Sequence, residues 1–300
     1  MPGGDAAVSC PIRNSQFAIR NFAAFTLLEL LVVISIMGIL AALAVPALKN
    51  LGKSNAQLGA ARQLLDDVGQ ARQLAIGGHT TVYMVFVPGY FWNSPETAGG
   101  SFNLTQSQQM VATNLLDKQF TGYNFLTLRS VGDQPGRGTT NYLGEWKSLP
   151  DGAFIATNKF NTVYSYPGGS YPSGYNSYPI YDYSGGSSLP SATYPINSFN
   201  YTSSFPFPTA TNAVGVSLPY IAFNYLGQLT VDGLDVAPQD EYIPLAQGTV
   251  AYAADLNKAL TFAAPDATEN PPGNSTNSMF DIVHIDRLTG RATLLQQQVQ

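Results

Sequence analysis

The sequence predicts an α+β fold in which one long N-terminal helix packs on an antiparallel β-sheet. Three observations support this prediction. Residues 25–48 form an apolar run, and residues 49–77 keep a helical spacing of apolar positions. After Gly78, short β-branched and aromatic segments are separated by glycine-containing turns. One helix followed by strands alone is typical of an α+β domain, because α/β domains alternate the two kinds of element.

The apolar run reads FTLLELLVVISIMGILAALAVPAL and holds 24 residues, with Glu29 as its one charged residue. At about 1.5 Å per residue, a helix of this length extends roughly 36 Å, which is enough to cross a bilayer core. Arg13 and Arg20 precede the run. Basic residues before a first hydrophobic segment favour a cytoplasmic N-terminus. We therefore expect a transmembrane helix with the rest of the chain on the far side of the membrane.

Glu29 is the unusual residue of this run. An ionised carboxylate at bilayer depth costs about 2.5–3.5 kcal/mol, and such residues usually have a partner and a function. The basic residues that flank the run, Arg20 and Lys49, lie outside it. The carboxylate is therefore expected either at the membrane interface or in contact with a partner from elsewhere.

Three interpretations of the run compete. A secretory signal would be cut after the A-x-A pattern at Ala42 to Ala44, but the run is long for such a signal and Glu29 is unusual inside one. A plain membrane anchor also leaves Glu29 unexplained. In the third interpretation, the string AFTLLEL from Ala24 to Leu30 closely resembles a prepilin signal. In proteins with that signal, a peptidase cuts before the aromatic residue and methylates the new amine.

The resemblance implies a role for each of these residues. Residues 1–24 would be the leader peptide, the peptidase would cut between Ala24 and Phe25, and Phe25 would be N-methylated. Glu29 would be the fifth mature residue, which meets the amine of a neighbouring subunit during filament assembly. Such a contact is physically reasonable because two charges that are costly to bury alone become tolerable as a pair.

Three further positions relate to the same family pattern. Pro46 and Gly38 lie where the family helix is often kinked or loosened, and a proline inside a helix removes one backbone hydrogen bond. Ala24 departs from the pattern, because the residue before the cut is normally glycine. This departure bears on how efficiently the leader is removed.

Residues 49–77 are expected to continue the helix as an amphipathic segment. Its apolar positions lie mostly three, four or seven residues apart, which places them on one stripe. They are Leu51, Leu58, Ala61, Leu65, Val68 and Ala75, with Arg62, Asp66, Asp67 and Gln70 on other faces. Gly77 and Gly78 provide the expected stop, because glycine readily takes the left-handed conformation found after helix C-termini.

Residues 78–300 are expected to form a periplasmic β-rich domain. We expect strands at 80–87, 153–156 and 249–252, hairpins at 220–225 with 229–231 and at 280–286 with 291–295, and a short helix at 104–119. An insertion at about 161–208 is rich in Tyr, Gly, Ser and Pro. Composition indicates either a loosely ordered surface insertion or a tyrosine-rich adhesive surface.

The order of these elements resembles the GspH/FimT class of minor pseudopilins and minor pilins. The fragments that carry the resemblance are the strand and turn IAFNYLG and the terminal turn Thr289-Gly290-Arg291. Arg291 matches a recurring family residue, although its position also suits a simple hairpin turn.

Catalytic chemistry has little support in the sequence, so we expect a protein that is not an enzyme. His79 and His284 are the two histidines, and no nucleophile, phosphate-loop or zinc motif is present. No cofactor is expected except calcium as an alternative, because Asp232, Asp235, Asp240 and Glu241 group oxygen ligands after a strand. A solvated acidic turn is the competing interpretation.

Charge argues against nucleic acid as a partner. After Gly77 the chain carries eight Lys or Arg residues against fifteen Asp or Glu residues, a balance of −7. Phosphate binding generally needs clustered positive charge. The one cysteine, Cys10, lies in the leader, so the mature chain would need neither disulfides nor a reducing compartment.

Together these observations predict a structural minor pseudopilin of a type II secretion system. It would sit in the bacterial inner membrane and then enter a periplasmic pseudopilus that drives protein export. The implied partners are prepilin peptidase, other pseudopilins or pilins, the inner membrane and secreted cargo. The alternatives are a minor type IV pilin for DNA uptake or adhesion, and a secreted β-rich binding protein.

Overall fold

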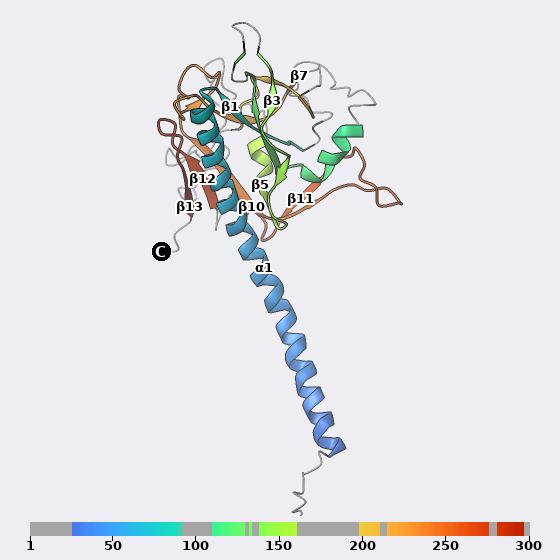
Figure 1. The fold of residues 1–300 in the computed structure, drawn as a ribbon. Coiled ribbons are helices and arrows are strands. Elements are labelled where there is room, and N and C mark those ends of the chain that lie inside the picture. Colours follow the sequence, from blue (N-terminus) through green and yellow to red (C-terminus); the bar gives the residue numbers. More distant parts are fainter. Residues whose placement is uncertain are drawn as a thin grey trace, which may run out of the picture. The chain divides into compact units, whose positions relative to one another are not determined.

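The computed structural model describes residues 26–89, 91, 110–129, 132–133, 138–160, 198–210, 215–275 and 281–296. The chain divides into two compact units, Met1–Leu48 and Lys49–Gln300. Helix α1 (Leu27–Gly78) belongs in part to each unit, and every strand belongs to the second (Figure 1). The strand pairs are antiparallel. The predicted α+β class is therefore confirmed.

The described strands form two larger sheets and one small sheet rather than the one sheet that was predicted. The first has the order β3-β2-β1-β8-β9, with β4 paired to β2. Its strands are β1 (Val82–Phe86), β2 (Gly122–Thr127), β3 (Asn141–Tyr142), β4 (Lys147–Ser148), β8 (Tyr220–Phe223) and β9 (Leu229–Thr230). The second has the order β11-β10-β12-β13, with β5 paired to β10. Its strands are β5 (Ala153–Ile155), β10 (Glu241–Ala251), β11 (Asp266–Glu269), β12 (Asp281–Ile285) and β13 (Ala292–Gln296). The small sheet pairs β6 (Ser204–Pro206) with β7 (Gly215–Ser217).

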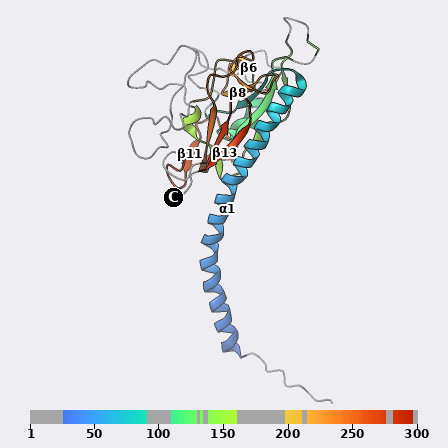
Figure 2. The same cartoon turned by 90° about the vertical axis from the view of Figure 1, so that its left-hand side faces the viewer.

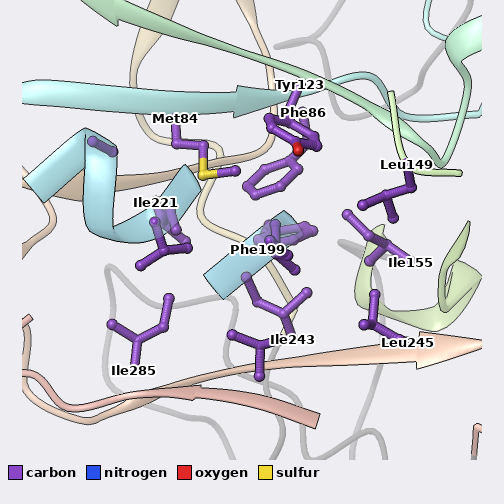
Figure 3. Close-up of a cluster of buried hydrophobic side chains, with 14 of the residues drawn as sticks. Met84, Phe86, Tyr123, Leu149, Ile155, Phe199, Ile221, Ile243, Leu245 and Ile285 are labelled. Carbon is purple, nitrogen blue, oxygen red and sulfur yellow. The ribbon is translucent and has the colours of Figure 1, made fainter. Parts of the chain in front are cut away.

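The main core lies where the two larger sheets and α1 meet. Figure 3 shows Met84 and Ile221 of the first sheet pointing toward Ile243 and Ile285 of the second. Helix α1 contributes a stripe of buried residues at helical spacing: Ala60, Ala61, Leu64, Val68, Ala71 and Ala75. The stripe differs from the predicted one at Leu58 and Leu65, which are half-buried at its edge.

The opposite face of the first sheet is also covered. Tyr83 of β1 packs edge-on against Phe205 of β6 and Tyr220 of β8, at centroid distances of 5.2 and 5.5 Å. Because both faces are buried, residues 80–87 show no alternation of apolar and polar side chains. The interpretation of 161–208 as a surface insertion is wrong for its last part, since Phe199, Phe205 and Phe207 are core residues. Residues 161–197 lie outside the described residues.

Several predicted strands and both hairpins are confirmed, but one strand was missed and another was predicted too short. Strand β2 was not predicted, and β10 is 11 residues long where only 249–252 was expected. The first part of β10 was not recognised in the sequence because it contains Pro244, and a proline usually argues against a strand interior. Its carbonyl accepts a hydrogen bond from the Ala156 N–H, at the point where the ladder with β5 ends at Ile155. The missing proline N–H therefore removes no hydrogen bond from the β5–β10 ladder.

The expected short helix at 104–119 is only partly described. Residues 110–112 are helical and lead into the 3-10 helix η1 (Thr113–Lys118). Leu115 and Leu116 of η1 are buried against the outer face of the first sheet. Residues 104–109 lie outside the described residues.

Helix α1 ends one residue later than predicted, and the left-handed residue is a histidine. His79 has φ = 44°, while Gly77 and Gly78 belong to the helix. The Thr80 N–H donates to the Ala75 carbonyl and the His79 N–H donates to the Ile76 carbonyl. These two bonds form a Schellman motif, in which the left-handed position is usually glycine. The prediction that a glycine provides the left-handed stop was therefore wrong.

A buried polar cluster holds α1 against the first sheet. Asp67, predicted to lie on a helix face other than the apolar stripe, is nevertheless only 7 % exposed. Its carboxylate accepts a hydrogen bond from the Tyr123 hydroxyl at 2.5 Å. It also forms an ion pair with Lys147, in which the ammonium nitrogen lies 2.5 Å from the carboxylate oxygen. Gln63 donates to the Tyr123 oxygen at 2.8 Å. Burial and the contact with Asp67 raise the pKa of Tyr123, so the hydroxyl stays protonated as the donor.

We predict that His79→Gly stabilises the protein by about 1 kcal/mol, because glycine relieves the cost of a left-handed residue. The matched variant Gly77→Ala should also stabilise, since Gly77 is helical and its added methyl would meet open space. Thermal unfolding measures both effects. A destabilised Gly77→Ala protein would mean that the left-handed residue is Gly77 after all.

We also predict that Asp67→Ala lowers the free energy of unfolding by about 2–3 kcal/mol, because the Tyr123 hydroxyl and Lys147 lose their buried acceptor. Asp66→Ala is the matched control. Asp66 is the exposed neighbour on the same helix, so its loss should change stability by less than about 0.5 kcal/mol. Urea unfolding followed by circular dichroism compares the two. Equal effects would contradict a special role for Asp67.

Candidate functional site

The first turn of α1 is capped by a side chain that the sequence interpretation did not single out. The Glu29 N–H donates to the Thr26 hydroxyl oxygen at 3.2 Å, and the Leu30 N–H donates to the Thr26 carbonyl at 3.1 Å. Thr26 is therefore the N-cap and Glu29 occupies the third helical position. The pattern Thr-x-x-Glu is a capping-box signature, and it was the available signal in the sequence.

The carboxylate of Glu29 stands at the positive end of the helix. An acidic side chain in the first turn is favoured there by the helix dipole. Glu29 is exposed, and within the described part of the chain its carboxylate accepts no hydrogen bond or ion pair. Ser35, by contrast, donates its hydroxyl to the Leu31 carbonyl at 2.8 Å. The described polar side chains of the first turns are thus satisfied internally, except for this carboxylate.

A continuous apolar surface surrounds Glu29. Leu28 and Leu30 are 72 % and 57 % exposed on either side of it. The surface continues along the helix through Leu27, Leu31, Val32, Val33, Ile34, Ile36, Met37, Ile39 and Leu40, all exposed. Exposed apolar area of this extent marks a surface that contacts another protein or a membrane.

The structure locates only some of the predicted positions of the N-terminal segment. Gly38 and Pro46 lie within α1, and a methyl group added at Gly38 would meet nothing within 4 Å. Ala24 and Phe25 lie outside the described residues. Among the described residues, no helix is both long enough and apolar enough to cross a membrane. The expected membrane-spanning half of the helix is therefore not confirmed.

The four acidic residues considered for calcium have different partners. The Asp232 carboxylate accepts the N–H groups of Leu234 and Asp235 at 2.9 and 3.0 Å. These backbone hydrogen bonds lower the pKa of Asp232. The described contacts of Asp235 come from its backbone: its N–H donates to Asp232, and its carbonyl accepts from the Thr230 hydroxyl at 2.6 Å. Asp232 therefore acts as the side-chain cap of a turn.

Asp240 and Glu241 belong to two other contacts. Asp240 accepts from His284 Nε2 at 2.9 Å and from the Arg287 N–H at 2.9 Å. Glu241 forms an ion pair with Lys159, whose side chain is fully buried and whose ammonium lies 4.8 Å from the centre of the Phe199 ring. Burial raises the pKa of Glu241 and lowers that of Lys159. In the described ranges, no group of three or more His, Cys, Asp or Glu residues could hold a metal ion.

The fold accounts for the positions of both histidines. His79 closes α1, as described above. The ring of His284 in β12 stacks on the ring of Tyr242 in β10, with 4.7 Å between the ring centres. Its Nε2 pairs with the Asp240 carboxylate. His79 contributes its backbone N–H to the end of the helix, whereas His284 contributes its side chain to the fold.

A pocket of about 430 Å³ lies between the end of α1 and the β2–β3 edge of the first sheet. Its lining includes Gln73, Leu74, Thr127, Arg129 and Asn141. Among the described residues that line it there is no carboxylate, histidine or cysteine. The pocket therefore offers amide, hydroxyl and guanidinium groups but no acid–base pair.

Comparison with known proteins identifies the N-terminal segment. Residues 19–45 match the family model of the prokaryotic N-terminal methylation motif, a range that includes Phe25 and Glu29. Searches of the curated proteins and of the solved structures found no match. The chain carries a prepilin-type cleavage and methylation motif, which confirms that resemblance. The narrower GspH/FimT class is not confirmed.

The motif has direct consequences for the kind of protein. It supports a type IV pilin-like or pseudopilin protein, and it implies processing by prepilin peptidase and assembly with other pilins. The geometry adds an exposed carboxylate in the first turn of an exposed apolar helix. These two observations lie in the same segment of the chain.

Proposed function

We propose that this chain is a structural subunit of a pilin-like filament, and specifically a minor pseudopilin of a type II secretion system. The observation that carries the proposal is Glu29, an exposed carboxylate in the capped first turn of an apolar helix inside a methylation motif. A carboxylate placed among exposed leucines needs a cationic partner once that surface is covered.

The cleaved N-terminus supplies such a partner. Removal of residues 1–24 would leave the amine of Phe25 one residue before the N-cap Thr26. N-methylation keeps an amine basic, so it stays positively charged at neutral pH. The Glu29 carboxylate of one subunit then pairs with the Phe25 amine of the next while their apolar helices pack together. Because only one register brings the two charges together, the pair fixes how far one helix slides along another.

The remaining parts of the proposal follow from this assembly step. Before assembly, the apolar run of residues 25–48 holds the subunit in the inner membrane, and the β-rich domain lies in the periplasm. Prepilin peptidase removes the leader at Ala24, and other pseudopilins contact the N-terminal helix. Secreted cargo is the expected partner of the completed filament. The role is structural rather than enzymatic, in keeping with the structural contacts of His284, Asp240 and the Lys159–Glu241 pair.

Mass spectrometry of the N-terminus of the native protein is the first test. We expect a chain that begins at Phe25 and is heavier by one methyl group. A chain that begins at Val45 would instead show a cleaved secretory signal and would overturn the proposal. An intact leader would show that Ala24 blocks processing. The variant Ala24→Gly is the matched control, because it restores the usual residue and should be processed at least as completely.

We further predict that Glu29→Gln inserts into the membrane normally but enters filaments at least tenfold less, because the neutral amide cannot balance the incoming amine. Sheared filament fractions and membrane fractions, quantified by immunoblotting, separate the two effects. Asp66→Asn removes an exposed carboxylate from the same helix and should assemble normally. Normal incorporation of Glu29→Gln would refute the role of Glu29.

A further inference from the structure

Two hairpin turns meet beside the end of α1. The turn between β8 and β9 contains Gly227, with φ = 78°, and the turn between β12 and β13 contains Gly290, with φ = 61°. A side chain at Gly290 would collide with the Gly227 carbonyl. The Leu229 N–H donates to the Arg287 carbonyl at 3.0 Å, and Arg72 of α1 donates to the Thr289 carbonyl at 2.7 Å. The two turns therefore form one joined surface.

This surface exposes large apolar side chains at positions where turns usually carry small polar residues. Tyr225 and Leu226 of the first turn are 52 % and 57 % exposed, and Leu288 of the second turn is 56 % exposed. Both turns are held rigidly. Asn224 accepts the N–H groups of Leu226 and Gln228, and Asp286 accepts the N–H and hydroxyl of Thr289. An ordered apolar surface loses little conformational entropy when it binds a partner.

Arginines border the same surface. Arg72 and Arg291 flank the Thr289 turn, and Arg287 lies beside them with its guanidinium on the Pro238 carbonyl at 2.9 Å. Within the described residues, none of the three forms an ion pair. Two carboxylates lie nearby: Asp286, which accepts hydrogen bonds from Thr289, and Asp240, which pairs with His284. The three arginines outnumber them, so the positive charge is in excess. We call Tyr225, Leu226, Leu288, Arg72 and Arg291 the turn patch.

The opposite end of the domain is acidic. The turn between β4 and β5 lies beside the α1 residue Ala56, because a side chain at Gly152 would touch it. From Ala56 to Arg72 the helix rises roughly 24 Å. Figures 1 and 2 both show β11 near the end of the domain opposite to the last turn of α1.

Three exposed carboxylates lie at this end: Asp117, Asp151 and Asp266. The Tyr252 hydroxyl donates to the Gln119 carbonyl at 3.3 Å, two residues after Asp117. The Gly248 N–H donates to the carbonyl of Gly152, the residue after Asp151, at 3.0 Å. Asp266 pairs with Ala251, the residue before Tyr252. The Lys118 ammonium lies 3.7 Å from the Asp117 carboxylate and forms an ion pair with it. Asp151 and Asp266 are therefore the carboxylates of this group that can pair with another molecule. We call the three residues the acidic end.

We propose that the turn patch of one copy packs on the acidic end of a second copy. The two surfaces have opposite charge and lie at opposite ends of one domain, so each copy offers both halves of the contact. Such a head-to-tail contact joins subunits into an open chain, because its two sides are different surfaces. Tyrosine, leucine and arginine provide an apolar centre with a charged border, the usual anatomy of a protein interface. The contact involves the domain alone and does not depend on the pairing of Glu29.

Cross-linking of the full-length chain tests the proposal. Cys10→Ser removes the natural thiol, and Leu288→Cys with Thr268→Cys places one thiol on each surface, because Thr268 is an exposed residue of β11 two positions from Asp266. The detergent-purified protein is treated with a short bismaleimide and separated on a denaturing gel. We expect a ladder of multimers, because every copy can be linked at both ends. The control replaces Leu288→Cys by Leu256→Cys, at a fully exposed leucine outside the patch, and should stay monomeric.

Charge reversal gives the second measurement. In the cross-linking background, Arg291→Glu should reduce multimer yield about fivefold, and Asp266→Arg should do the same. Combining the two should restore the yield, because the opposite charges face each other again. No ladder above the control would overturn the proposal. A dimer from Leu288→Cys alone would also overturn it, since the patch would then pack on itself.

Glu29→Gln separates this contact from filament assembly through the helix. We expect that variant to give the same cross-linked ladder as the parent, although its assembly into filaments fails. A ladder lost in Glu29→Gln would show that the N-terminal helices alone bring the copies together, and would contradict the domain contact. The domain contact and the assembly role of Glu29 can therefore be refuted independently of each other.

Discussion

The close approach of α1 to both larger sheets is the constraint on which the domain depends. Four of the six residues of its buried stripe are alanines, so the helix backbone lies near strands of both sheets. Apolar burial is favourable at about 25 cal/mol per Å², but it has no direction. The hydrogen bonds of Asp67 to Tyr123 and of Arg72 to Thr289 add direction, because each is made in only one position of the helix.

The same helix has opposite surroundings at its two ends. Ala60 to Ala75 are buried in the domain core, whereas Leu27 to Leu40 expose large apolar side chains. A stand-alone domain has no use for such an exposed run, because apolar surface of this extent is costly in water. A subunit that packs through its helix needs both halves, one to carry the domain and one to join its neighbours. The methylation motif over residues 19–45 falls on the exposed half.

Local patterns predicted the fold where one short segment decides the geometry. Both predicted hairpins form, and their turn glycines, Gly227 and Gly290, take left-handed conformations. The failures were non-local. Pro244 pairs with Ile282 of β12, and it is tolerated because the ladder with β5 on its other side ends at Ile155. Asp67 is buried because Tyr123 and Lys147, which are distant in sequence, contact its carboxylate. His79 takes the left-handed position next to two glycines, which residue preference alone would not select.

In the candidate site, too, local arrangements could be predicted from the sequence and non-local contacts could not. Thr26 and Glu29 lie within one helical turn, so the sequence suffices to place them together. Asp240 and Glu241 are also neighbours in sequence, yet they face different partners, His284 and Lys159. Successive residues of a strand point to opposite faces, so adjacency at the start of β10 separates two carboxylates instead of gathering them. Grouping acids by sequence distance assumes that side chains of adjacent residues converge. A helix turn satisfies that assumption at intervals of three or four residues, and a strand violates it at every step.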